Sequence, residues 1–291
     1  MTWSPCTLCP RQCAADRGAN RRGYCGAGTK AEIFRYGPHH GEEPPISGTR
    51  GSGTVFFSRC TMRCLYCQNF PWSQCGEGKE YGTGDLGRIF SELAEAGCHN
   101  WNLVSPTPWM PAIVDGLALA RAGGHSLPVV YNTSGFERIE TLRELEGRVD
   151  IYLTDLRYAR AESAVAGSDA PGYVAAAREA LRTMWAQVGP LTTDGDQVAK
   201  RGTICRLLIL PGKADEAVAN LEWAATTIGT GLAVSVMAQY TPAHKAPGNV
   251  EWGRGITRRE YDMVVEAAGD LGFGSGWIQA YGEPPPEGLL G

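Results

Sequence analysis

The chain lacks the features that mark several common classes of protein. No apolar run approaches the ~18 residues that a membrane span requires, so we expect no membrane partner. The N-terminus has no apolar core of a signal peptide, which predicts a cytoplasmic location. Basic residues are not in excess either: 27 Lys and Arg against 31 Asp and Glu leave a net charge of −4, so no nucleic-acid partner is expected.

Cysteine, by contrast, is abundant. Seven of the ten cysteines fall into two tight groups, Cys6, Cys9, Cys13 and Cys25, and then Cys60, Cys64 and Cys67. A cytoplasmic compartment keeps thiols reduced, so grouped cysteines there more often bind metal or carry out chemistry than form disulfides. The other three are dispersed, as is typical of small buried apolar side chains.

The chain divides near residue 53. Residues 1–53 are rich in glycine and arginine without helical periodicity, which predicts a Cys-rich N-terminal extension ordered by metal. Residues 54–291 alternate apolar runs with amphipathic segments. The predicted strands are residues 54–58, 101–105, 127–132, 149–155, 203–210 and 232–238. The predicted helices lie near 84–97, 110–123, 136–147, 172–188, 214–228 and 257–271.

This alternation indicates an α/β fold, with a parallel sheet covered by helices. Six strands in roughly 190 residues fit a barrel-like array better than an open two-domain sheet. We therefore predict a partial (β/α)6 TIM-like barrel over residues 54–291, with its reacting residues at the carboxyl ends of the strands.

The second cysteine group follows directly on the first predicted strand. Cys60, Cys64 and Cys67 have the spacing C-x3-C-x2-C. A cubane iron–sulfur cluster normally takes four thiolates, so three cysteines leave one iron open to a small molecule with an amine and a carboxylate. The alternative is that Cys75, eight residues after Cys67, completes a four-thiolate zinc or electron-transfer site.

This spacing at this place resembles the radical S-adenosylmethionine (radical SAM) superfamily. Further motifs through nearly the whole chain resemble its PflX-like group, which is related to pyruvate formate-lyase activating enzyme. These motifs are CTLCPRQC at 6–13, GEEPPISG at 41–48, CQN at 67–69, SPTP at 105–108, YNTSG at 131–135, DIYLTDLRY at 150–158 and MAQY at 237–240. The resemblance implies a [4Fe-4S] cluster, SAM as the ligand of its open iron, and an electron donor such as flavodoxin or ferredoxin.

The resemblance also implies SAM-binding roles for residues near the strand ends. Tyr66 matches a position near the adenine, and Thr107 one near the SAM amine. Asn132 and Ser134 are in place to bond the ribose or carboxylate, or else form a turn that caps the next helix.

Later strands continue the pattern. Asp155 matches an acidic position near the SAM carboxylate, followed by Arg157 where relatives have lysine. Arg206 matches the arginine that holds the SAM carboxylate, with a structural ion pair to Asp155 as the alternative. Gln239 and His244 close the sixth strand, and His244 is either a SAM or substrate contact or an ordinary loop histidine.

Two groups have less direct parallels. His40 and Glu42 are predicted to contact the substrate or gate the cavity, against the alternative of a polar turn. The first four cysteines, Cys6, Cys9, Cys13 and Cys25, have the spacing C-x2-C-x3-C-x11-C, which predicts a closed second metal site. Its occupant is either an auxiliary iron–sulfur cluster or zinc, and unliganded thiols are the third possibility.

Taken with the resemblance, these residues predict an oxygen-sensitive radical SAM enzyme. It cleaves SAM reductively to a 5′-deoxyadenosyl radical and abstracts a hydrogen atom from a small metabolite or peptide. One alternative is an activating enzyme that installs a glycyl radical on a partner protein. The other is a non-enzymatic electron-transfer or zinc scaffold that uses both cysteine groups.

Overall fold

The fold is described for residues 1–283 of a computed structural model. The strands are β1 (Ala31–His39), β2 (Ser52–Phe57), β3 (Lys79–Tyr81), β4 (Trp101–Val104), β5 (Val129–Thr133), β6 (Ile151–Asp155), β7 (Thr192–Thr193), β8 (Ala199–Leu208), β9 (Ala233–Met237) and β10 (Gly276–Ile278). The helices are α1 (Pro44–Ser47), α2 (Phe70–Ser73), α3 (Thr83–Glu95), α4 (Met110–Ala122), α5 (Ile139–Glu144), α6 (Ala161–Ser168), α7 (Tyr173–Val188), α8 (Ala214–Thr227) and α9 (Arg258–Asp270). A 3-10 helix, η1, covers Thr107–Trp109.

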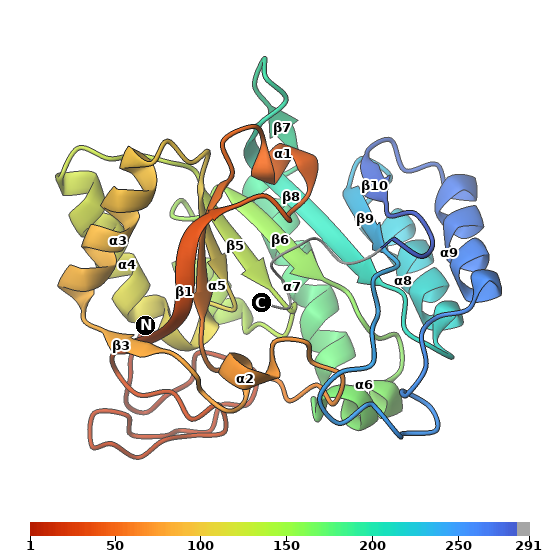
Figure 1. Cartoon of the computed structure of the whole chain (residues 1–291), viewed down its shortest axis with the longest axis horizontal. Coiled ribbons are helices and arrows are strands. Elements are labelled where there is room, and N and C mark those ends of the chain that lie inside the picture. Colours follow the sequence, from red (N-terminus) through yellow and green to blue (C-terminus); the bar gives the residue numbers. More distant parts are fainter. Residues whose placement is uncertain (284–291) are drawn as a thin grey trace.

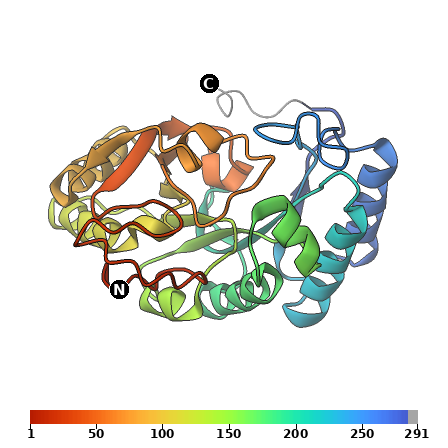
Figure 2. The same cartoon turned by 90° about the horizontal axis from the view of Figure 1, so that it is seen from below.

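The strands form one curved sheet in the order β10-β9-β8-β6-β5-β4-β2-β1-β3, with β7 paired to β8 (Figure 1). The strands from β2 to β9 along this path are parallel, and they match the six predicted strands, which confirms the α/β prediction. Six helices match the predicted ones and lie along the outer side of the sheet (Figure 2). Within residues 1–283 the path ends at β3 and β10, so closure into a barrel is not seen.

The N-terminal residues are connected to the main sheet. β1 pairs antiparallel with β2, so residues 31–39 belong to the main sheet. The preceding segment is tied to the body of the protein by hydrogen bonds instead. Arg11 Nε donates to the carbonyl of Thr61 at 2.6 Å, and Thr141 Oγ1 donates to the carbonyl of Leu8 at 2.9 Å. The predicted boundary at residue 53 therefore falls inside β2.

Side chains alternate between the two faces of each strand, and this alternation builds the interior. On the outer face, Tyr131, Tyr152 and Val234 pack with the helices in two large apolar clusters. The inner face begins at the amino ends of the strands with an apolar layer. This layer consists of Val130, Ile151, Leu153, Ala199, Ile204 and Ala233. Polar side chains follow it toward the carboxyl ends.

A short helix seals the amino end of this interior. α1 places the fully buried Ile46 against the inner apolar layer. Pro44 at its first position has no N–H to satisfy, and the amide of Gly48 closes the turn onto the carbonyl of Pro44 at 2.8 Å. The two residues before the helix, Glu42 and Glu43, are thereby directed toward the polar layer.

No helix within residues 1–283 is long and apolar enough to cross a membrane.

Replacing the sealing side chain is expected to destabilise the fold. Ile46→Ala removes a buried apolar group and leaves a cavity, which we expect to lower the free energy of unfolding by about 2–4 kcal/mol. Ile278→Ala, at a side chain that is half exposed, is the matched control and should cost under about 1 kcal/mol. Urea denaturation of both variants checks this, and equal losses would contradict the role of Ile46.

Candidate functional site

A cavity of about 350 Å³ opens at the carboxyl ends of the parallel strands. Most of the predicted site residues line it, which the strand-end rule anticipated. They are His40, Glu42, Cys60, Cys64, Tyr66, Cys67, Asn132, Ser134, Asp155, Arg206 and Gln239. Thr107 and His244 are not among its lining residues, and neither is Cys75, which is exposed. Cys75 therefore lies outside the cavity that Cys67 lines.

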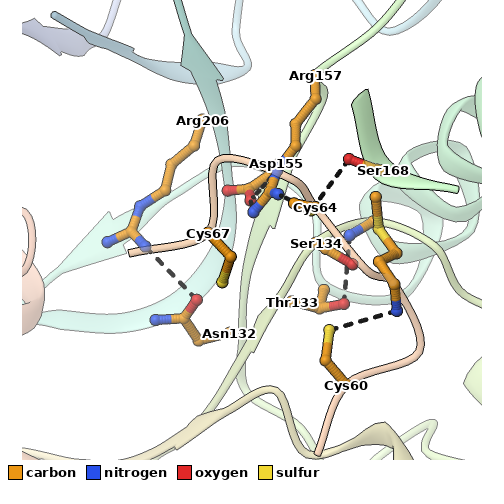
Figure 3. A network of polar contacts seen from close by, with 12 residues as sticks. Cys60, Cys64, Cys67, Asn132, Thr133, Ser134, Asp155, Arg157, Ser168 and Arg206 are labelled. Carbon is orange, nitrogen blue, oxygen red and sulfur yellow. Dashed lines mark hydrogen bonds and ion pairs between the residues drawn. The ribbon is translucent and has the colours of Figure 1, made fainter. Parts of the chain in front are cut away.

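The three cysteines lie on the loop between β2 and α2 (Figure 3). Hydrogen-bond donors surround the sulfur of Cys64: Arg157 Nη1 at 3.2 Å and Ser168 Oγ at 3.0 Å. Cys67 Sγ hydrogen-bonds with Ser73 Oγ at 3.3 Å. Donors of this kind stabilise anionic sulfur and tune the metal that the sulfur binds. The loop is therefore suited to thiolates.

As free thiols these groups hold their protons tightly. Burial, together with the nearby Cys64, raises the pKa of Cys60 to about 12 and that of Cys67 to about 11. A bound metal reverses this tendency, because it replaces the proton and deprotonates the thiol. In residues 1–283 no three His, Cys, Asp or Glu side chains converge closely enough to hold a single metal ion. A cubane cluster spreads its ligands over several irons, so three cysteines around one cavity fit a cluster better than a single ion.

Arg157 links the cysteine loop to the sheet. Its Nε and Nη2 atoms donate to Asp155 Oδ2 at 2.9 and 2.5 Å, while Nη1 reaches the sulfur of Cys64. Asp155 ends β6 and faces the interior. A lysine has one charged nitrogen and would not bridge the carboxylate and the sulfur in this fixed geometry. The arginine noted in the sequence at this position is therefore a structural link between two parts of the site.

Arg206 bonds two carboxylates of this chain, those of Glu42 and Glu43. Its Nε and Nη2 bond Glu43 at 2.8 and 2.6 Å, and Nη2 also bonds Glu42. The alternative ion pair with Asp155 is not formed, because Asp155 pairs with Arg157. Burial alone would raise the pKa of Glu43. The Arg206 guanidinium outweighs this effect and holds that pKa below its ordinary value. Glu43 was not among the predicted site residues, and its only sequence signal was its place in the GEEPPISG motif.

Asparagine side chains extend this network across the interior. Asn102 Nδ2 donates to Glu42 Oε1 at 2.9 Å, and Asn132 Nδ2 donates to the same atom at 3.3 Å. Asn132 Oδ1 in turn lies 3.5 Å from Arg206 Nη1. The Asn132 side chain thus points inward, while its neighbour Thr133 makes the local turn by accepting the amide of Gly135 at 3.2 Å.

Thr107 belongs to a different network, which lies behind the cavity wall. Its hydroxyl donates to Glu137 Oε1 at 2.6 Å, and Thr133 donates to the same oxygen. Tyr131 OH donates to Glu137 Oε2 at 3.2 Å. Glu137 is buried, and no cation within residues 1–283 forms a salt bridge with it. Burial therefore raises its pKa to about 7, against the lowering effect of the three hydroxyls. Nothing in the sequence distinguishes this glutamate from an exposed one.

Aromatic side chains form the wall near the cysteines. Tyr66 stacks on Trp252 at 5.3 Å between ring centroids, and its hydroxyl contacts that of Tyr158 at 2.5 Å. Gln239 accepts a hydrogen bond from Gln279 at 3.1 Å. His244 instead stacks on Phe70 at 4.5 Å, outside the lining residues of the cavity.

The four N-terminal cysteines lie near one another without forming a metal-ligating group in the described residues. Cys6 and Cys9 are buried, whereas Cys13 is exposed. Arg17 is buried among them and donates to Cys6 Sγ at 3.1 Å and to Cys25 Sγ at 3.8 Å. The expected second metal site is therefore not supported by this arrangement.

Similarity to known proteins was found both in sequence and in fold. No protein-family model matches the chain. The uncharacterized protein MJ0674 of Methanocaldococcus jannaschii is 25% identical over 273 residues, which cover 90% of this chain and 74% of MJ0674. Streptococcus suis SuiB bound to its precursor peptide SuiA aligns over 77% of this chain with 11% identity and a TM-score of 0.51. A second SuiB structure aligns with 10% identity and a TM-score of 0.50.

These alignments cover 47% of SuiB, so the chain spans about half the length of that protein. The likeness shows that the chain shares the α/β fold of SuiB.

The buried carboxyl of Glu137 predicts a pH dependence of stability. Because its pKa rises from an ordinary 4.5 to about 7 in the folded protein, the folded state binds more protons between these values. Its contribution to stability therefore falls as pH rises from 4.5 to about 7, by up to about 3 kcal/mol. In Glu137→Gln we expect the free energy of unfolding to fall less between pH 5 and pH 8 than in the wild type. The exposed Glu222→Gln is the control, and an unchanged pH profile in Glu137→Gln would contradict the assignment.

Proposed function

We propose that this protein is a radical SAM enzyme in which Cys60, Cys64 and Cys67 hold a [4Fe-4S] cluster. The observation that carries the proposal is the cysteine loop itself: three cysteines line one cavity, and its lining in residues 1–283 includes no fourth cysteine. When bound, the cluster and SAM supply a 5′-deoxyadenosyl radical that abstracts a hydrogen atom from the substrate. Everything else in the site serves to bind, orient and shield.

The residues around the loop have distinct parts in this proposal. Arg157 and Ser168 donate to the sulfur of Cys64 and thereby stabilise its thiolate form. Asp155 fixes the guanidinium of Arg157, and it lines the cavity at the position that the resemblance places near the SAM carboxylate. Tyr66 and Gln239 offer a ring and an amide to the adenine end of SAM, and Asn132 and Ser134 offer polar groups to its ribose.

Three expected SAM contacts change in this proposal. The donors of Arg206 that face Glu42 and Glu43 are used, so we assign Arg206 to holding those glutamates rather than to the SAM carboxylate. Thr107 is bonded to Glu137 and acts on the cavity only through the loop that Glu137 holds. His244 lies outside the lining residues and is given no contact with SAM.

The finer features of the expected function are proposals of the same kind. The substrate is a small metabolite or peptide, and the reducing electron comes from a flavodoxin or ferredoxin. SuiB is bound to a peptide in its structure, which is in keeping with a peptide here. The membership of the PflX-like group rests on the motifs of the sequence, and the cytoplasmic location rests on composition. A glycyl-radical protein remains the alternative substrate.

Anaerobic reconstitution tests the cysteine assignment. We expect the reconstituted wild-type protein, reduced with dithionite in the presence of SAM, to release 5′-deoxyadenosine. Cys64→Ala should reduce this product at least 100-fold, because it removes a ligand of the cluster. Cys75→Ala is the matched control and should retain it, since Cys75 is exposed and lies outside the cavity. Product measured by chromatography from Cys64→Ala at the wild-type level would contradict the proposal.

Metal analysis of the same samples decides what the N-terminal cysteines hold. If they bind an auxiliary cluster, the wild type contains about eight irons and Cys9→Ala about four. If they bind zinc, one zinc accompanies about four irons and is lost in Cys9→Ala. We expect about four irons and no zinc, because Arg17 already bonds two of the sulfurs and the described residues form no metal-ligating group there. About four irons and no zinc would show that these thiols are unliganded.

A further inference from the structure

The cavity wall around Arg206 carries more acid than base. Glu42 and Glu43, here called the acid pair, share the one guanidinium of Arg206, and all three side chains are 12% exposed or less. His40 also lines the cavity and is counted as neutral, and the other two charges on the wall, Asp155 and Arg157, neutralise each other. One negative charge therefore remains uncompensated by the described lining residues. Buried charge is costly unless it is paired, so a cation that enters the cavity is favoured here.

A second, independent observation at the acid pair is a missing hydrogen-bond donor. The fully buried side chain of Asn102 is directed at Glu42, because its Nδ2 donates to Glu42 Oε1 at 2.9 Å. Its other amide atom, Oδ1, has no hydrogen-bond partner among the described residues. Native proteins leave few buried acceptors unsatisfied, so the hydrogen bonding around Glu42 is incomplete in the described residues. The cavity side of the acid pair also lacks a positive charge, which an ammonium or guanidinium group supplies.

The geometry argues against a metal ion as this cation. A metal would bind between the two carboxylates, and that position is taken by Arg206, which donates to both. The positive charges of a metal ion and of the Arg206 guanidinium would repel each other strongly in this buried site. An organic cation has directional N–H donors and can bond the remaining lone pairs of the acid pair from the cavity side. Its source is either the substrate or the ammonium of SAM.

We propose that the acid pair binds a cationic nitrogen group of the substrate, so that the enzyme acts on a compound with an amine or guanidinium side chain. This inference rests on the proposed function, because the acid pair shares its cavity with Cys60, Cys64 and Cys67. Asp155 on β6 and Arg206 on β8 lie side by side in the register of the sheet. Because Arg206 holds the acid pair, the cationic group binds one strand away from Asp155, which is linked to the cysteine loop through Arg157.

Matched neutral probes test the proposal on the reconstituted protein with SAM bound. The probes are the N-acetyl methylamides of arginine and lysine, compared with those of citrulline and norleucine, which have similar shape but no charge. Calorimetric titration of the wild type should give Kd values at least 10-fold lower for the charged probes. In Glu42→Gln this preference should fall to 3-fold or less. The exposed Glu222→Gln is the matched control and should keep it.

Three outcomes would overturn the proposal. Equal binding of charged and neutral probes to the wild type does so without any variant, which covers the case that Glu42→Gln fails to fold. A preference that survives in Glu42→Gln removes the acid pair from recognition. A large loss of SAM affinity in Glu42→Gln, with no probe preference in the wild type, assigns the acid pair to the SAM ammonium. The release of 5′-deoxyadenosine by the wild type is measured in parallel, so failure of the radical SAM proposal is seen separately.

Discussion

Charged side chains inside the sheet must be paired, and this constraint organises the cavity. Strand alternation turns Asp155 and Arg206 toward the interior, where an unpaired charge costs several kcal/mol. Asp155 finds Arg157 two residues later, whereas Arg206 finds Glu43, 163 residues away in sequence. The pairing of Arg206 with Glu43 requires the segment before α1 to cross the inner face of the sheet. The same segment leads into α1, which packs Ile46 on the inner apolar layer, so this ion pair and the apolar layer depend on the same course of the chain.

The repeating part of the fold was predictable, because each strand and helix is encoded locally. Buried runs such as residues 151–155 read as strands, and amphipathic segments such as residues 83–95 read as helices. β1 escaped prediction because its buried residues end at Ile33 and its second half, which contains Gly37 and Pro38, is partly exposed. The predicted boundary at residue 53 therefore did not take the pairing of β1 with β2 into account. Barrel closure depends on long-range pairing at the sheet edges, which no local pattern specifies.

The candidate site was predictable where a motif names its residues, and the cysteine loop is the clearest case. The hydrogen-bond and ion-pair partners of these side chains could not be predicted from the sequence in the same way. Arg206 was expected to meet either a ligand carboxylate or Asp155, but the sequence does not show that Glu42 and Glu43 lie across the interior. Glu137 gave no signal at all, since its burial and its hydroxyl donors, which lie in η1 and β5, are properties of the tertiary structure. Thr107 was placed in the cavity for the same reason: the distance of one strand end from another is a tertiary property.

In the proposed function, the cysteine loop holds a cluster with one iron left for SAM. Electron paramagnetic resonance of the reduced, reconstituted protein tests this, with spectra recorded before and after SAM is added. We expect the g values of the cluster signal to shift on saturation with SAM, because a ligand enters at the open iron. Superimposable spectra at saturating SAM would show instead that no iron of the cluster is open to SAM.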